Sequence, residues 1–147
     1  MLYWDDIRVG QFFEAGPRSI EQDEIIAFAE KYDPQYFHTD PDGAKQSQFG
    51  GLIASGWQTA AIGHKLMCEA FLDHIAGMGS PGLDQLRWLK PVRPGDALRI
   101  RVEIVDSWPS RSRQNMGMLR HKVELFNQND ERVYAMDSLG MFERRQR

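Results

Sequence analysis

The 147-residue chain has little cysteine and little net charge, and it lacks any long hydrophobic run. Its single cysteine, Cys68, excludes an internal disulfide and fits a reducing compartment. A net charge of −3 gives no reason to expect a nucleic-acid partner. No apolar run is long enough to span a bilayer, and residues 1–20 hold no apolar core of signal-peptide length. We therefore expect a cytoplasmic protein without a membrane or nucleic-acid partner.

Familiar nucleotide, hydrolase and metal motifs are also missing from the sequence. There is no P-loop, no Gly-x-Gly-x-x-Gly and no Gly-x-Ser-x-Gly. His64 and His74 lie ten residues apart, which is not a ligand spacing. We expect no metal and no redox cofactor.

The composition is that of a globular protein, with 41% hydrophobic and 27% charged residues. The length predicts one domain over residues 1–147. Apolar residues at helical spacing predict a helix over about residues 20–32, with Ser19 and Gln22 in capping-box form. Pro34 disfavours helix at Asp33, so this residue is expected at the helix exit.

A second helix is predicted from Gly56, and its nearly all-round apolar surface indicates that it is buried. The segment 77–82 is rich in glycine and is expected to end this helical region. Most of the remaining chain alternates apolar and polar residues, which is typical of strands with one face in water. Strands are expected over residues 11–14, 83–89, 98–104, 119–125 and 133–142.

A long apolar helix in a β-rich chain requires a sheet that curves around it. So few strands leave sheet edges and part of the core exposed, which favours pairing with a second copy. We expect a homodimer or a higher homo-oligomer.

The most informative segment runs from residue 32 to residue 57. Asp33 and His38 lie five residues apart, and a carboxylate–imidazole pair can hold and activate a water molecule between its two groups. Free N–H groups at the helix start near Gly56 can stabilise a developing oxyanion. Structural roles are the alternatives: Asp33 as a turn residue, His38 as a core histidine and Gly56 as a packing residue.

Taken together, these residues resemble the MaoC-like dehydratase family, hotdog-fold proteins that include the (R)-specific enoyl-CoA hydratases. The resemblance rests on Asp33 and His38, on the run Gly50-Gly51-Leu52-Ile53-Ala54-Ser55-Gly56, and on the turn from Pro91 to Gly95-Asp96. It implies an α+β hotdog fold, with an antiparallel sheet wrapped around a long central helix. The chain departs from the family pattern at Gln35, Tyr36 and Ser55.

The resemblance implies a hydratase or dehydratase of fatty acid metabolism that adds water to a 2-enoyl thioester, expected to be 2-enoyl-CoA, to give a 3-hydroxyacyl thioester. Coenzyme A is then part of the acyl-CoA substrate, and no separate cofactor is implied. The catalytic residues implied are Asp33 as the base, His38 as orienter and proton relay, and the Gly56 N–H as oxyanion donor. The candidate substrate-binding residues are Ser55, Gly51, Trp57 and Gln35, although Ser55 is expected first as an N-cap. The alternatives are an acyl-CoA thioesterase and a non-catalytic acyl-CoA-binding subunit on the same fold.

Overall fold

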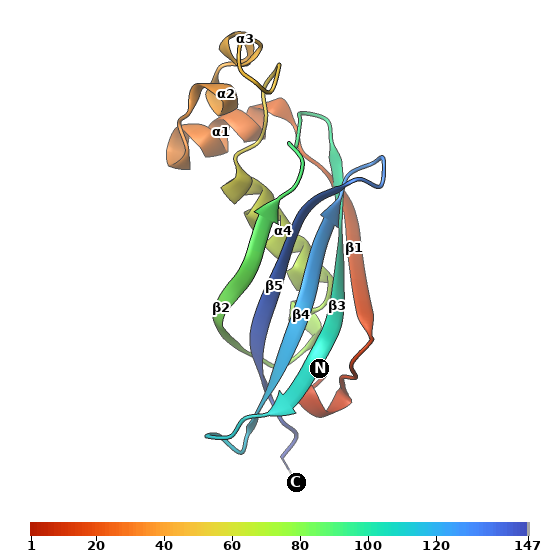
Figure 1. Ribbon diagram of the computed structural model, residues 1–147. Coiled ribbons are helices and arrows are strands. Elements are labelled where there is room, and N and C mark those ends of the chain that lie inside the picture. The colour runs from red at the N-terminus through yellow and green to blue at the C-terminus, as the bar shows by residue number, and fades with distance from the viewer. Residues whose placement is uncertain (147) are drawn as a thin grey trace.

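A five-stranded antiparallel sheet curves around one long helix in the computed structural model, which describes residues 1–146 (Figure 1). The strand order is β1-β3-β4-β5-β2. The strands are β1 (Phe12–Ser19), β2 (Gly77–Trp88), β3 (Ala97–Pro109), β4 (Met116–Phe126) and β5 (Arg132–Glu143). The helices are α1 (Gln22–Tyr32), α2 (Tyr36–Thr39), α3 (Pro41–Ala44) and α4 (Gly56–Ala70), with 3-10 turns η1 (Trp4–Asp6) and η2 (Leu72–His74). The expected α+β hotdog fold, a single domain with α4 at its centre, is confirmed.

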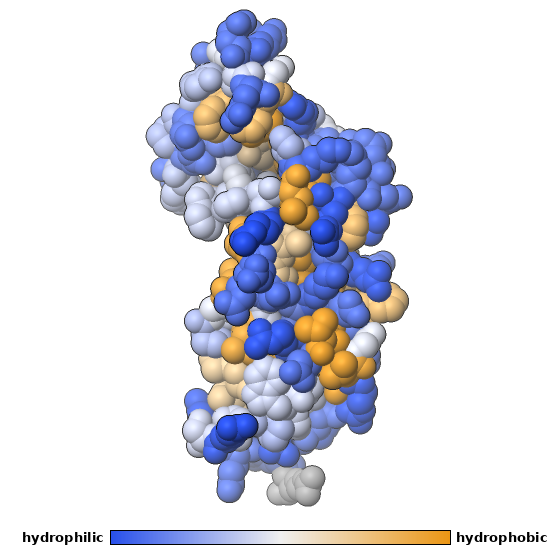
Figure 2. All heavy atoms as spheres, viewed as in Figure 1, coloured by the Kyte–Doolittle hydropathy of each residue, from blue (hydrophilic) through white to orange (hydrophobic). Residues whose placement is uncertain are grey.

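The core lies between α4 and the inner face of the sheet. Every second residue of β3 from Leu98 to Ile104 is buried, and β4 and β5 show the same alternation. The outer face in Figure 2 is largely hydrophilic, as this alternation requires. Gly63 lets α4 approach the sheet closely, because a β-carbon there would lie 2.9 Å from Leu125 Cδ1.

Two short segments differ from the expectation. The first strand continues through Gly16 to Ser19, because Gly16 adopts a φ of +102° where the β1–β3 register shifts. The capping box of α1 is formed by Glu21 and Glu24 rather than by Ser19 and Gln22, so the helix begins at Gln22.

The glycine-rich segment 77–82 follows the end of the helical region, as expected, but it also belongs to the sheet, so β2 begins at Gly77 rather than at residue 83. It forms the first half of β2, which pairs with β5 through three register shifts. Gly79, with a φ of +105°, lies at one of these irregularities. Because β2 is an edge strand, the loss of regular pairing is tolerated there.

The prediction that α4 is buried on nearly all sides is also wrong for the single chain. Ile62, Leu66 and Met67 face the core, whereas Trp57 is 61% exposed and His64 lies on the same open side. No helix within residues 1–146 has both the length and the apolar character needed to cross a membrane.

Helices α1, α2 and α3 form a small lobe, residues 22–44, beyond the N-terminal end of α4 (Figure 1). The lobe is joined to the α4 segment by hydrogen bonds between distant residues. The Gln58 amide donates to the Glu24 carbonyl at 3.0 Å, and the Ile53 N–H donates to the Phe37 carbonyl at 3.1 Å. This junction positions the site described next.

Candidate active site

Two breaks in helical structure bring Asp33 and His38 to one side of the lobe. Asp33 is the C-cap of α1, where its N–H still bonds to the Ala29 carbonyl while its backbone turns away from helical angles. Pro34 cannot continue the helix, and the chain restarts as the short helix α2. His38 lies in α2 and is only 4% exposed. The local sequence therefore turns both side chains toward the junction with α4.

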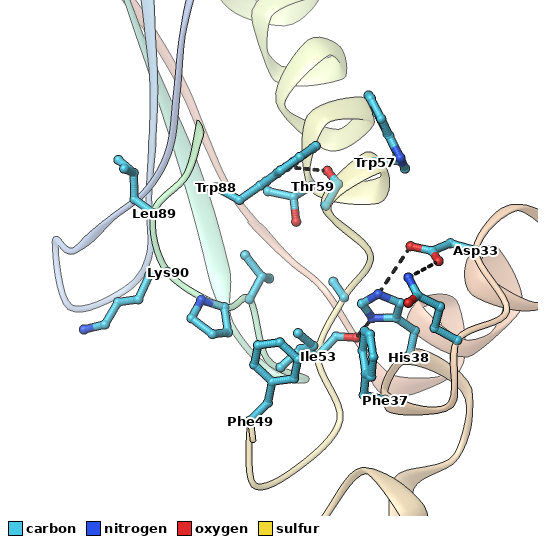
Figure 3. A pocket seen from close by; sticks show the side chains of 15 residues that line it. Asp33, Phe37, His38, Phe49, Ile53, Trp57, Thr59, Trp88, Leu89 and Lys90 are labelled. Atoms are coloured by element: carbon cyan, nitrogen blue, oxygen red, sulfur yellow. Dashed lines mark hydrogen bonds and ion pairs between the residues drawn. The ribbon is translucent and has the colours of Figure 1, made fainter. Parts of the chain in front are cut away.

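The two side chains point at each other (Figure 3). Asp33 Oδ2 lies 3.3 Å from His38 Nε2. His38 Nδ1 lies 2.7 Å from the Ile53 carbonyl oxygen. A carbonyl oxygen can only accept a hydrogen bond, so Nδ1 carries the hydrogen and donates it. In the neutral ring, Nε2 therefore presents its lone pair to the carboxylate.

The Asp33 carboxylate is held by two donors. Ser55 Oγ donates to Oδ2 at 2.7 Å, and Gln35 Nε2 donates to Oδ1 at 2.8 Å. Partial burial raises the pKa of Asp33, but these two hydrogen bonds and the charge of His38 when its ring is protonated outweigh it, so the pKa lies below the ordinary value of an aspartate. Asp33 is therefore ionised at neutral pH and accepts hydrogen bonds.

Two facing acceptors require a donor near them. While the ring is neutral and its Nδ1–H is committed to Ile53, neither His38 Nε2 nor the Asp33 oxygens can donate to the other, whereas a protonated ring donates its Nε2–H to Asp33 Oδ2. A water molecule beside the pair can satisfy both by donating one hydrogen to each, which leaves its oxygen lone pairs free. The 3.3 Å separation is shorter than the water-sized gap expected from the sequence, so such a water lies beside the line joining the two groups.

The N-terminus of α4 lies across from this pair. Ser55 is the N-cap, and its Oγ accepts the Trp57 N–H at 3.3 Å. The Gly56 N–H has no hydrogen-bond partner among residues 1–146. Trp88 lies directly against Gly56, and its Nε1 donates to the Gly56 carbonyl at 2.8 Å. Trp57 packs edge-on against Trp88 with ring centroids 5.3 Å apart.

A cavity of about 410 Å³ joins these elements (Figure 3). Of the residues expected at the site, it is lined by Asp33, His38, Gly56, Trp57 and Gln35. The other two expected residues do not line it. Ser55 is fully buried behind Asp33, and Gly51 lies next to the Arg93 guanidinium instead.

Several cavity walls were not expected from the sequence. Phe37, Phe49 and Trp88 contribute aromatic surface, and Thr59 lines the cavity one turn into α4. Phe37 packs edge-on against the His38 ring with centroids 4.5 Å apart, and Phe49 packs against Phe37 with centroids 5.3 Å apart. Phe37 and Phe49 could have been expected at the cavity, because both lie between Asp33 and the glycine-containing run of residues 50–56. Trp88 carried no such signal, because only strand pairing brings it to Gly56.

Comparison with known proteins places the chain in a family. Residues 7–125 match the MaoC like domain. The chain is 36% identical to the uncharacterized protein YdeM of Bacillus subtilis over 133 residues, covering 88% of this chain and 91% of that protein. It is 30% identical to a 3-hydroxybutyryl-CoA dehydratase of Methylorubrum extorquens, covering 79% of this chain and 72% of that protein.

A solved structure agrees with these sequence matches. The MaoC-like dehydratase from Rhodospirillum rubrum superposes with a TM-score of 0.92 and 36% sequence identity, and the match covers all of both chains. Fold and sequence therefore agree, and this chain belongs to the MaoC-like dehydratase family.

Proposed function

We propose that the protein is a hydratase/dehydratase that adds water to a 2-enoyl thioester, specifically 2-enoyl-CoA, to give the 3-hydroxyacyl thioester. The observation that carries the proposal is the Asp33–His38 pair near the N-terminal end of α4, in which the hydrogen bond to Ile53 fixes the tautomer of the neutral His38 ring. With a neutral His38 ring, the pair offers two acceptors and no donor toward the cavity, which suits the binding of one attacking water. The dehydratase named among the relatives supports the same reaction class.

Hydration forms a C–O bond at Cβ and a C–H bond at Cα. The water oxygen attacks Cβ while Asp33 accepts one of its protons, and the π electrons move toward the thioester carbonyl. His38 orients the water through Nε2 and relays a proton to Cα. One proton leaves the water and one is added to carbon, so the pair ends in its starting state. Dehydration is the reverse.

The developing negative charge on the thioester oxygen needs a donor. The Gly56 N–H has no intrahelical partner and lies at the positive end of the α4 dipole. A hydrogen bond there strengthens as the enolate forms, which is the requirement for transition-state stabilisation.

The active unit that we propose is a cytoplasmic homodimer formed along β2. Nearly all of β2 is exposed, including Leu83 at 49% and Trp88 at 45%. β2 is an edge strand, so one of its sides has no neighbouring strand within residues 1–146. The open side of α4 lies next to it. An unpaired edge with apolar side chains is a ready site for antiparallel pairing with a second copy.

A crotonyl-CoA assay with two readouts tests the function. Loss of enoyl absorbance without release of free thiol is the expected result. Release of free thiol would instead show a thioesterase. Binding of crotonyl-CoA without either change would show a non-catalytic subunit.

A further inference from the structure

Residues 45–51 form a strap that leads from α3 toward the start of α4 and has no helical or strand structure of its own. Its hydrogen bonds are mostly internal. The Phe49 N–H donates to Ser47 Oγ at 3.2 Å, and the Gly50 N–H donates to the Ser47 carbonyl at 3.0 Å. These bonds fold the strap on itself but do not attach it to the sheet.

One arginine makes that attachment. Arg93, in the turn between β2 and β3, donates from Nη2 to the Phe49 carbonyl. Among residues 1–146, no other hydrogen bond or ion pair joins the strap to a residue outside the strap and the α1–α3 lobe. Gly51 lets the guanidinium lie against the strap, because a β-carbon there would lie 3.4 Å from Arg93 Nη1. The position of the strap relative to the sheet therefore depends on Arg93.

The backbone that carries Arg93 is itself well fixed. The Arg93 N–H donates to Asp96 Oδ2 at 2.8 Å, and the Asp96 N–H donates back to the Arg93 carbonyl at 3.0 Å. Gln128 Nε2 donates to the other Asp96 oxygen at 2.9 Å, and the Gly95 N–H donates to the Ile20 carbonyl at 2.8 Å. Because the turn has these separate supports, the guanidinium restrains the strap rather than the reverse.

The strap supplies one aromatic wall of the active-site cavity. Phe49 lines the cavity and packs against Phe37, which packs in turn against the His38 ring (Figure 3). Arg93 is not among the residues within 1–146 that line this cavity. The guanidinium therefore acts from behind the wall, and the two ring contacts connect it to the His38 side of the site.

We propose that Arg93 is a positioning residue: it latches the strap so that Phe49 completes the cavity wall before the substrate binds. This proposal rests on the proposed function, because it assigns a further residue to the same site. Without the latch, the substrate must select the closed strap from a mixture, and its apparent affinity falls in proportion to the closed fraction. Once the substrate is bound the wall is complete, so the chemistry at Asp33 and His38 keeps its rate.

The test separates KM from kcat for crotonyl-CoA in Arg93→Met, which keeps an unbranched apolar side chain but cannot donate. We expect KM to rise by about tenfold, the effect of losing one charge-assisted hydrogen bond, and kcat to stay within about twofold. Arg99→Met is the matched control, because Arg99 also joins the sheet to a turn, through Asp130 Oδ1 at 2.8 Å, and should leave both constants unchanged. In a Phe49→Ala background, Arg93→Met should add nothing, since the latch acts through Phe49.

A direct contact between Arg93 and a phosphate of coenzyme A would also raise KM. The crotonyl thioester of N-acetylcysteamine carries no phosphate and distinguishes the two explanations. The latch predicts the same rise in KM for this compound as for crotonyl-CoA. A rise for crotonyl-CoA alone would show a phosphate contact and would overturn the proposal.

Amide hydrogen exchange tests the latch without turnover. The Phe49 and Gly50 amides should exchange about tenfold faster in Arg93→Met than in the wild type or Arg99→Met. Unchanged exchange, a fall in kcat without a rise in KM, or an effect that persists in Phe49→Ala would each overturn the proposal.

If Arg93→Met fails to fold, Arg93→Lys replaces it and should show smaller changes of the same sign, because an ammonium lacks the fixed fork of the guanidinium. The exchange measurement also separates the latch from the proposed function. Faster exchange in Arg93→Met, in a protein that does not hydrate crotonyl-CoA, would support the latch and reject the hydratase. Hydration with unchanged exchange and unchanged KM would do the opposite.

Discussion

The Trp88 indole occupies the space where residue 56 would carry a β-carbon. An ideal Cβ on Gly56 would lie 2.5 Å from Trp88 Cε2 and 2.8 Å from Nε1. The same ring nitrogen donates to the Gly56 carbonyl at 2.8 Å. The glycine at the start of α4 is thus required by an indole of the same chain, whatever else it contacts during the reaction.

This contact predicts strong coupling between substitutions at the two positions. Gly56→Ala should lower the melting temperature, because its methyl group overlaps the indole. In a Trp88→Ala background the same change should have little effect on stability. A double-mutant cycle measured by thermal unfolding should give a coupling of about 1–3 kcal/mol. Additive effects would show that the indole moves away without cost.

The acid–base pair is tested by separate substitutions. Asp33→Asn and His38→Ala should each lower crotonyl-CoA turnover by about two orders of magnitude or more, because each removes a group that handles the water. Asp42→Asn provides a matched control, since that carboxylate lies on α3 and is exposed. Near-normal turnover in a folded Asp33 or His38 variant would exclude that residue from catalysis.

Ser55 links the helix start to the carboxylate, so its loss should change two properties. Ser55→Ala removes the N-cap of α4 and should destabilise the protein by about 1 kcal/mol in urea unfolding. It also removes a hydrogen bond that lowers the pKa of Asp33, so turnover should fall and its acid limb should shift to higher pH. Ser110→Ala, which removes a loop hydroxyl that accepts the Arg113 N–H and does not line the cavity, should affect stability alone. Unchanged turnover in Ser55→Ala would limit Ser55 to capping.

His121 makes stability depend on pH in a defined window. Burial lowers its pKa to about 4 in the folded protein, from 6.5 when exposed, so the unfolded state binds the proton more tightly. Stability should therefore fall as the pH drops through 6.5, and the loss should be complete below about pH 4. The free energy of unfolding should fall by roughly 3 kcal/mol over this range in the wild type and in the control His74→Phe. In His121→Phe this contribution should be absent. Urea unfolding at several pH values across this range measures the free energy of unfolding. The same dependence on pH in His121→Phe and His74→Phe would contradict the effect of His121 burial. Asp33 does not contribute here, since its lowered pKa places its titration below this window.

The β2 edge predicts the oligomeric state. We expect light scattering to show a dimer at micromolar concentration. Leu83→Lys should weaken the dimer, because it places a charge in the middle of the paired edge. Val105→Lys, at an exposed position of the interior strand β3, is the matched control. A stable wild-type monomer would reject the proposed pairing.

The features that the sequence predicted correctly are those set by residues close to one another along the chain. Asp33 and His38 are brought together within five residues by one proline, and Gly56 begins a helix that its own apolar pattern marks. The alternation in β3, β4 and β5 is equally local, so all three strands were predicted, although β3 continues to Pro109, five residues beyond the predicted end at 104.

What the sequence did not predict depends on long-range pairing. Trp88 reaches Gly56 only because β2 pairs with β5 through three register shifts, and glycine-rich pairing of this kind has no simple periodicity. The partner of His38 Nδ1 is a backbone carbonyl fifteen residues away, which no side-chain pattern encodes. The open side of α4 was missed because its apolar composition alone does not show which of its faces the sheet of the same chain covers.

The hydrogen bonds that prepare Asp33 and His38 also fasten the α1–α3 lobe to the rest of the molecule. Ser55 hydrogen-bonds Asp33, and the Ile53 carbonyl accepts a hydrogen bond from His38, so each of the two proposed catalytic side chains is bonded across the junction between the two parts. Local opening of the lobe must break both contacts and therefore switches off the chemistry at the same moment. A ligand that bridges the junction would slow amide hydrogen exchange throughout residues 22–44, including helices that it never touches.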